Sequence, residues 1–392
     1  MRYLSERVMR ACIFALFATM FGVLGTKGPS AQEVREQPNA VQLIQFLQNN
    51  PENRRARWAL SQMAFKAGRY DIAGYHVQHL LQISSSQQDI DTLTRALAAI
   101  TTADPWNVEL SFALLPSSNI RRYTYNDEFE TVLGIFTPIG GGKEESGIGI
   151  SVGAGLSYAL SLPDNSRLTL RASVDHNLYD TSDLNQTHLL FAARHDFFSL
   201  GHSTTIEPYL SFRFDEGLIL DRRKIGLNLS RNWWLEEGAQ FRASAVIENR
   251  DYLVDEVLSG PYGRVSLRYS YALNDQLRLG FGFALARSEP QRVHLKYWEG
   301  QMSVDASRRF ENVGVFGLFS RYTERRYDNI FPATTLIRED KTFTLGVSYQ
   351  HNSFEILGSR PKISCQVERN SSNIALYDYK ATDCGLTFER SF

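Results

Sequence analysis

Two hydrophobic periods divide this chain of 392 residues. From about residue 32 to residue 103, apolar residues recur at helical spacing, as at Val41, Ile44 and Leu47. After Pro105, apolar and polar residues alternate with a period of two. The pattern therefore predicts a helical segment that is followed by a long region of β-strands.

The alternation is strict in segments of ~10 residues, which is typical of a transmembrane β-barrel. Within residues 264–273, for example, Val265 and Leu267 alternate with Arg264 and Ser266. One face of such a strand contacts lipid and the other faces the lumen. The alternative is a soluble β-sandwich, which has no need for so many outward Phe, Leu and Tyr residues opposite an arginine-rich face.

The segments number fourteen, and an even number suits a closed single-chain barrel. We expect strands near residues 125–136, 148–161, 166–178, 187–197, 204–214, 222–234, 239–251, 262–273, 276–288, 298–309, 313–324, 340–350, 361–370 and 380–392. Tight turns such as 163–165 alternate with longer loops, and the two kinds match the two rims of a barrel. The longer loops are expected at 138–147, 178–187, 252–261, 288–297 and 325–339. The long connection 351–360 falls on the short-turn rim as an exception.

The N-terminal region predicts export. An apolar run from Ala11 to Gly25 follows basic residues and ends in small ones, as in a signal peptide, and a membrane anchor is the alternative. We assign residues 1–31 to the signal peptide, 32–104 to a helical periplasmic segment, 105–124 to a junction and 125–392 to the barrel.

The helical segment contains one hairpin with a tetratricopeptide-like spacing of small and large residues. Its marker residues are Trp58, Ala64, Gly68, Tyr70 and Ala73. Such a hairpin either lines a groove that holds a peptide or forms a plain helical cap, and the sequence leaves both interpretations open.

The inward face of the predicted strands carries many arginines. They are Arg167, Arg171, Arg213, Arg242, Arg264, Arg268, Arg278 and Arg309. Because a cation at the bilayer midplane costs roughly 2–4 kcal/mol, these residues must line a wet or self-paired lumen. They form either a hydrogen-bonded structural interior or a path for a substrate.

The charge balance and the position of one motif argue against several other classes of protein. The 42 basic and 43 acidic residues nearly cancel, so no charge field indicates nucleic acid as a partner. Gly149, Ser151 and Gly153 match the nucleophile-elbow pattern of hydrolases, but they lie inside an alternating strand with no helix after it. We therefore expect no enzyme, metal or cofactor, and a hydrolase built on a barrel is the alternative.

Cys365 and Cys384 have the same outward parity on the last two predicted strands. In a hairpin centred near Ile374 they lie opposite each other, and an oxidising periplasm permits a disulfide there. Two buried thiols are the alternative, because cross-strand disulfide geometry is often unfavourable.

Short motifs accompany the barrel pattern. They are Pro116, Ser117, Ser118, Asn119 and Ile120 at the predicted junction, and Trp298, Gly300, Arg325, Arg326, Tyr327, Asn373, Tyr377, Asp378, Tyr379 and Phe392 in the barrel. With the helices and the strand count, these motifs make the chain resemble the surface lipoprotein assembly modulator (Slam) family over nearly its whole mature part. One departure is Arg121, where the family pattern favours Asn.

The resemblance implies an outer-membrane protein of a Gram-negative bacterium that helps lipoproteins or secreted proteins reach the cell surface. We expect a monomer in contact with outer-membrane lipid, the barrel-assembly machinery and a protein client, which Trp58, Met63, Tyr70 and Tyr75 would meet. The helical segment of this chain is shorter than the family's, which is a departure from a full client-binding groove. Alternatives are a passive anion-preferring porin-like channel and a surface adhesin acting through loops 138–147, 252–261 and 325–339.

Overall fold

The computed structural model describes residues 38–50, 53–84, 86–137, 144–235, 238–274, 276–311, 313–352, 354–356 and 358–392. The predicted signal peptide, residues 1–31, lies outside these residues. The chain divides into two compact units, residues 1–56 and 57–392. Among the described residues, the fold is mainly β, with four helices before a closed antiparallel barrel of fourteen strands.

The four helices follow the predicted helical period. They are α2 (Pro38–Asn49), α3 (Arg54–Lys66), α4 (Tyr70–Gln82) and α5 (Gln87–Ala103). Gly68 adopts a φ of +73° in the turn between α3 and α4, a conformation that glycine takes without strain. The Ser86 side chain accepts a hydrogen bond from the Asp89 amide and caps α5. Among the described helices, none is both long enough and apolar enough to cross a bilayer.

An apolar core holds α4 and α5 together. Val77 and Ile90 are almost fully buried, and Leu80 and Leu93 pack in the same cluster. Side chains of this size each stabilise a fold by about 1.5–3 kcal/mol when fully buried. The helices thus depend on mutual packing rather than on length.

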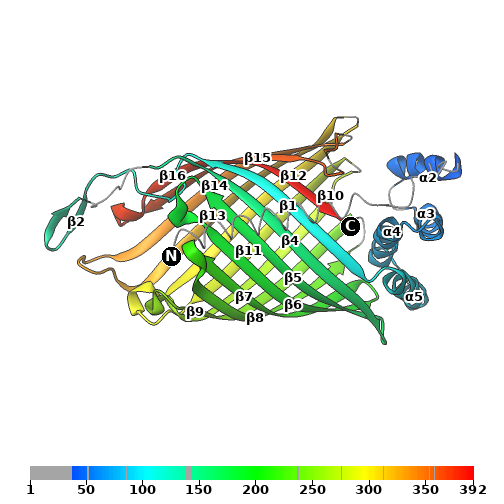
Figure 1. Cartoon of the computed structure of the whole chain (residues 1–392), viewed down its shortest axis with the longest axis horizontal. Helices are drawn as coiled ribbons and strands as arrows, with labels where there is room; N and C mark the ends of the chain where they lie inside the picture. The colour runs from blue at the N-terminus through cyan, green and yellow to red at the C-terminus, as the bar shows by residue number, and fades with distance from the viewer. Residues whose placement is uncertain are drawn as a thin grey trace, which may run out of the picture. The chain divides into compact units, whose positions relative to one another are not determined.

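Consecutive strands pair around the barrel, and the ring closes where β1 pairs with β16 (Figure 1). The barrel strands are β1 (Trp106–Ser117), β4 (Gly147–Leu162), β5 (Ser166–Tyr179), β6 (Gln186–Ser199), β7 (His202–Asp215), β8 (Ile219–Trp234), β9 (Ala239–Tyr252), β10 (Gly260–Ala272), β11 (Leu277–Ser288), β12 (Tyr297–Phe310), β13 (Gly314–Ile330), β14 (Ile337–His351), β15 (Lys362–Ser372) and β16 (Tyr379–Ser391). The predicted fold class and strand number are confirmed.

The position of the first strand was wrong. Residues 105–124, expected as a junction, contain β1, and the predicted strand 125–136 contains only the short hairpin β2 (Phe129–Thr131) and β3 (Gly134–Phe136). The hairpin forms a separate sheet of two strands. The physical reason is that Trp106, Val108, Leu110, Phe112 and Leu114 supply the alternating apolar face that a lipid-facing strand needs.

The two rims differ in the length of their connections, as predicted. Tight turns join β4 to β5 and β6 to β7, whereas the opposite rim carries the longer connections and their short 3-10 helices. We call the two ends the tight-turn rim and the long-loop rim. The connection between β14 and β15 is the expected exception on the tight-turn rim.

The predicted loop 325–339 was too long. Strand β13 continues to Ile330 and β14 begins at Ile337, so Arg325, Arg326 and Tyr327 lie within a strand and not at a loop edge. A register shift between Arg326 and Ile330 lets the two strands extend beyond the neighbouring ones.

Helix α5 contacts the tight-turn rim. The Asn165 side chain, in the turn after β4, accepts a hydrogen bond from the Thr94 hydroxyl at 2.5 Å and donates one to the Asp91 carboxylate at 2.8 Å. Phe198 at the end of β6 packs against the helical core. The tight-turn rim is therefore the end of the barrel that α5 contacts.

Candidate functional site

The inner wall of the barrel is the candidate functional site. On β10, Val265, Leu267 and Tyr269 are exposed on the outer face, while Arg264 and Arg268 lie on the other. The same alternation runs around the barrel and leaves a lipid-facing surface of large apolar side chains. The charges gather inside, where they contact one another.

Five of the eight predicted lumen arginines have polar partners on the inner wall. The Arg268 guanidinium lies 2.6 Å from Asp305, Arg264 lies 3.2 Å from Glu299, and Arg167 lies 3.5 Å from Asp196. Arg213 pairs with Asp221 and Asp215, and Arg242 donates to the Ser230 hydroxyl. For Arg171, Arg278 and Arg309, no hydrogen bond or ion pair to another described residue is recorded.

Glu299 on β12 joins arginines from two sides. It accepts hydrogen bonds from Arg264 on β10 and from Arg325 on β13, the latter at 2.6 Å. The Arg325 guanidinium also lies 4.5 Å from the centre of the Tyr297 ring, within range of a cation–π interaction. The Glu299 side chain is only 12% exposed, so its charge depends on both partners.

A segment that follows β1 ties the barrel closure together at the long-loop rim. We call residues 117–126 the latch. The Arg122 guanidinium binds Asp383 on β16 at 2.6 Å and Glu368 on β15 at 3.3 Å. The Tyr379 hydroxyl donates to the same Glu368 at 2.9 Å. These contacts connect β1 to both of the last two strands.

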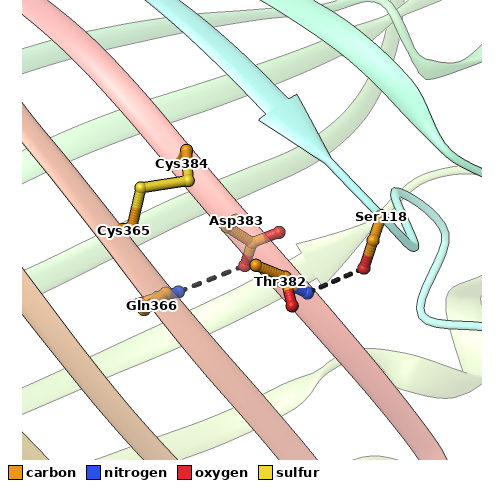
Figure 2. The surroundings of a disulfide bond; sticks show 6 residues. All are labelled: Ser118, Cys365, Gln366, Thr382, Asp383 and Cys384. Atoms are coloured by element: carbon orange, nitrogen blue, oxygen red, sulfur yellow. Dashed lines mark hydrogen bonds between the residues drawn. A yellow bond between two sulfur atoms is a disulfide. The ribbon is translucent and has the colours of Figure 1, made fainter.

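Asn119 fixes the path of the latch. It is fully buried, and its amide nitrogen donates to the carbonyls of Tyr123 and Lys380. Ser118 and Thr382 exchange hydrogen bonds across the closing strands, one of which is drawn in Figure 2. A fully buried amide with satisfied partners is costly to replace, so this position specifies the loop conformation.

Aromatic side chains surround a second arginine at the same rim. The Arg338 guanidinium lies 4.7 Å from the Tyr327 ring centre and 3.0 Å from that of Tyr377. Arg338 also pairs with the buried carboxylate of Asp340 at 2.8 Å. This stack joins β13 and β14 to the loop before β16.

The structure moves the motif Pro116 to Ile120 away from its predicted place. These residues end β1 and begin the latch, at the long-loop rim, whereas α5 contacts the tight-turn rim. Arg325, Tyr327, Tyr377, Asp378, Tyr379 and Asn373 lie at the long-loop rim as well. Arg121, the departure from the family pattern, pairs with Glu145 and Asp183.

Three other motif residues lie at the same rim but face outward, and Phe392 lies at the other rim. Trp298 and Arg326 are 57% and 66% exposed and lie on the outer face of the barrel. Gly300 shares the parity of Trp298 on β12. Phe392 lies at the tight-turn rim, where its backbone exchanges hydrogen bonds with Val108.

The sequence reasoning missed several residues that carry these contacts. Arg122, Glu299, Arg338, Glu368 and Asp383 were not singled out. The inward parity of Glu299, Glu368 and Asp383 followed from the predicted strands, whereas Arg338 fell in the predicted loop 325–339. Their partners could not be read, because the register between strands decides which inward residues meet.

Cys365 and Cys384 are direct partners in the register of β15 and β16. Their sulfur atoms are joined in a disulfide, and the two Cα atoms are 4.0 Å apart (Figure 2). Both residues share the outward parity of Ile363 and Val367. The bond thus clamps the last two strands on their outer face.

Within the described parts of the chain, no group of three or more His, Cys, Asp or Glu residues could hold a metal ion. The predicted elbow residues Gly149, Ser151 and Gly153 lie inside β4. The chemistry of the site is that of ion pairs and hydrogen bonds along a barrel wall.

A closed barrel with an apolar exterior and a charged, self-paired interior defines the class of outer-membrane β-barrel proteins. More specifically, the chain belongs to a family described as surface lipoprotein assembly modifier, whose model matches residues 106–392. The matched region begins at β1 and contains the whole barrel.

Solved barrel structures resemble the chain at low sequence identity. The outer membrane channel DcaP of Acinetobacter baumannii is 10% identical, with a TM-score of 0.42 over 73% of this chain and 96% of that one. The anion-selective porin from Comamonas acidovorans is 8% identical, with a TM-score of 0.39 over 73% and 98%. A Pseudomonas aeruginosa FadL homologue is 12% identical, with a TM-score of 0.39 over 75% and 91%. No curated protein matched the sequence.

Proposed function

We propose that this protein assists the display of lipoproteins or secreted client proteins at the surface of a Gram-negative cell. The observation that carries the proposal is the family match over the whole barrel. In this proposal the helices and the tight-turn rim face the periplasm, and the long-loop rim faces outward, as the short turns and longer loops of such barrels do.

The charge pairing of the inner wall supports this function over that of a simple anion channel. Arg268 pairs with Asp305, Arg213 pairs with both Asp215 and Asp221, and Arg264 and Arg325 share Glu299. Four carboxylates thus face these four arginines, so their positive field in the lumen is largely neutralised. An anion-selective pore needs unneutralised cations along its path. A wall with paired charges can contact a polar client without binding it tightly.

The helices would meet the client in the periplasm. Of the side chains expected to do so, Trp58 and Tyr70 pack against the helical core, while Tyr75 is 63% exposed. Phe65 is 38% exposed and forms an edge-to-face pair with Tyr70. We therefore assign client contact to Tyr75 and Phe65, with folding of the client outside the cell as the driving free energy.

Deletion of the gene, followed by labelling of surface proteins on intact cells, tests the proposal. We expect a small set of proteins to disappear from the surface while remaining in the cell, and wild-type protein to restore them. Tyr75→Ala should restore them less well than Gln78→Ala, a change at an exposed position of the same helix. An unchanged surface proteome after deletion would exclude the export function.

The competing function is a passive anion-preferring channel. Arg171, Arg278 and Arg309 favour it, because no partner for them is recorded among the described residues and they share the inward parity. Current recordings in planar bilayers distinguish the two functions. A sustained anion current that Arg171→Ala and Arg309→Ala reduce would indicate the channel.

A further inference from the structure

Three exposed cations lie on the outer face of neighbouring strands at the long-loop rim. They are Lys341 on β14, Arg369 on β15 and Lys380 on β16. Arg369 is the direct register partner of Lys380. Residues directly opposite each other on adjacent strands have Cβ atoms about 4.5–5.5 Å apart, and like charges in that arrangement destabilise a sheet.

The carboxylate of Asp378, two residues before Lys380, forms hydrogen bonds with other groups. Asp378 accepts hydrogen bonds from the Ser372 amide and from Asn126. In the part of the chain that the structure describes, no ion pair is recorded for Arg369 or Lys380, and the recorded side-chain contact of Lys380 is the ring of Tyr125 at 5.1 Å.

Lys341 extends the patch onto the next strand. It lies opposite Glu324, which already pairs with Arg326, and Glu339 is two residues away on the same face of β14. Its charge is therefore partly compensated, and Arg369 with Lys380 forms the centre of the patch.

Other outward arginines at this rim are neutralised. Arg223 pairs with Asp251, Arg326 with Glu324, and Arg287 with Asp328. The pair of Arg369 and Lys380, for which no ion pair with a described carboxylate is found, thus differs from these arginines and can bind an anion from outside the chain.

The position of the pair identifies the source of that anion. Phe343 is the register partner of Arg369, and Val367 follows on the same face; both are about half exposed and belong to the lipid-facing surface. The cations therefore lie where the apolar surface ends, at the level of lipid head groups.

We propose that Arg369 and Lys380, with Lys341 beside them, bind the phosphate group of a glycolipid in the outer leaflet. The guanidinium of Arg369 can bind two phosphate oxygens, and the ammonium of Lys380 supplies a second point charge. The acyl chains of the lipid lie along Phe343 and Val367. This site rests on the orientation proposed above and not on the export of a client.

The disulfide stabilises the same pair of strands. Cys365 lies four residues before Arg369 and Cys384 four residues after Lys380, so the bond lies about 13 Å farther toward the membrane centre. The bond joins β15 to β16 (Figure 2). It therefore holds the two strands in register against the repulsion between Arg369 and Lys380.

The test uses the full-length protein in nanodiscs that contain lipid A, and native mass spectrometry counts the retained lipid. We expect wild-type protein to retain lipid A from nanodiscs that contain the phosphorylated form. It should retain none from nanodiscs in which dephosphorylated lipid A takes its place. The double variant Arg369→Ala, Lys380→Ala should bind about thirtyfold more weakly, as two basic contacts at a membrane surface imply. Arg326→Ala, at the same rim, is the matched control.

Two further variants separate lipid binding from folding. Arg369→Glu places an opposite charge beside Lys380, so it should stabilise the barrel and still lose the lipid. Arg369→Lys should keep both the bound lipid and the stability of the wild-type barrel. Equal retention by the double variant and by Arg326→Ala would overturn the proposal, as would retention that does not depend on the phosphate. If millimolar inorganic phosphate displaced all of the bound lipid A, the ligand of the site would be a free anion and not the lipid.

Discussion

Arg268 on β10 and Asp305 on β12 are joined across the intervening strand β11, with 2.6 Å between guanidinium and carboxylate. The bridge passes over Gly280, where an added Cβ would lie 2.5 Å from Arg268 and 2.6 Å from Asp305. Tyr209 reaches Glu248 over Gly226 in the same way. Each such contact fixes the register of three consecutive strands.

Gly280→Val is expected to destabilise the barrel by about 1–3 kcal/mol, because the new side chain displaces the ion pair that crosses it. Unfolding by urea in detergent micelles, followed by the gel mobility of the folded barrel, measures the loss. Gly263→Val is the control, since nothing lies within 4 Å of its added Cβ. Equal stability of the two variants would contradict the role of Gly280.

Glu368→Gln is expected to loosen the latch. The carboxylate accepts hydrogen bonds from Arg122 and Tyr379, and the change leaves both with a weaker partner. Limited proteolysis of intact cells should cut residues 117–137 several-fold faster than in wild type. Glu324→Gln, which removes an exposed pair with Arg326, should leave the rate unchanged.

Breaking the disulfide by Cys365→Ser and Cys384→Ser is expected to cost about 3 kcal/mol, the value for a closed loop of this size. The two cysteines are separated by 19 positions in the sequence. Mass spectrometry of peptides without reduction should recover the two cysteines linked. Recovery of two free thiols from protein isolated under oxidising conditions would exclude the bond.

Acidification is expected to weaken the packing of α4. Burial, with a contribution from Arg57, lowers the pKa of His79 from 6.5 to about 4. The unfolded helix therefore binds a proton first as the pH falls, and stability is lost between pH 6.5 and 4. Hydrogen exchange, corrected for intrinsic rates, should show lower protection of α4 at pH 5 than at pH 7.

His79→Gln should remove most of this pH dependence, and His294→Gln, at the opposite rim, should retain it. A protection profile of α4 that is the same at both pH values in the wild type would contradict the role of His79.

The alternation of apolar and polar residues was enough to predict thirteen of the fourteen barrel strands and their facing, and the total agreed because the segment 125–136 was counted in place of β1. The prediction works because successive residues of a strand between lipid and a polar lumen face the two environments in turn. The first strand was missed although Val108, Leu110 and Phe112 carry the same signal, because residues 105–124 were interpreted as a junction.

The contacts of the inner wall could not be predicted in the same way. Arg268 and Asp305 are 37 residues apart, and Ser117 and Asp383, which share a hydrogen bond of 2.7 Å, are 266 apart. A shift of one residue in the strand that carries either partner would turn that partner to the lipid. The registers of all the strands together decide these pairs.

Closure between β1 and β16 has a consequence for biogenesis. The edge of β1 has no partner until every other strand has been delivered to the membrane, and an open edge is prone to wrong pairing. The residues of the latch that bind Asp383 and Lys380 likewise lack these partners until β16 is in place. The contacts of the latch with β16 therefore form only in the closed ring, and in the orientation proposed above an antibody to the ordered residues 117–126 would detect closed barrels on living cells.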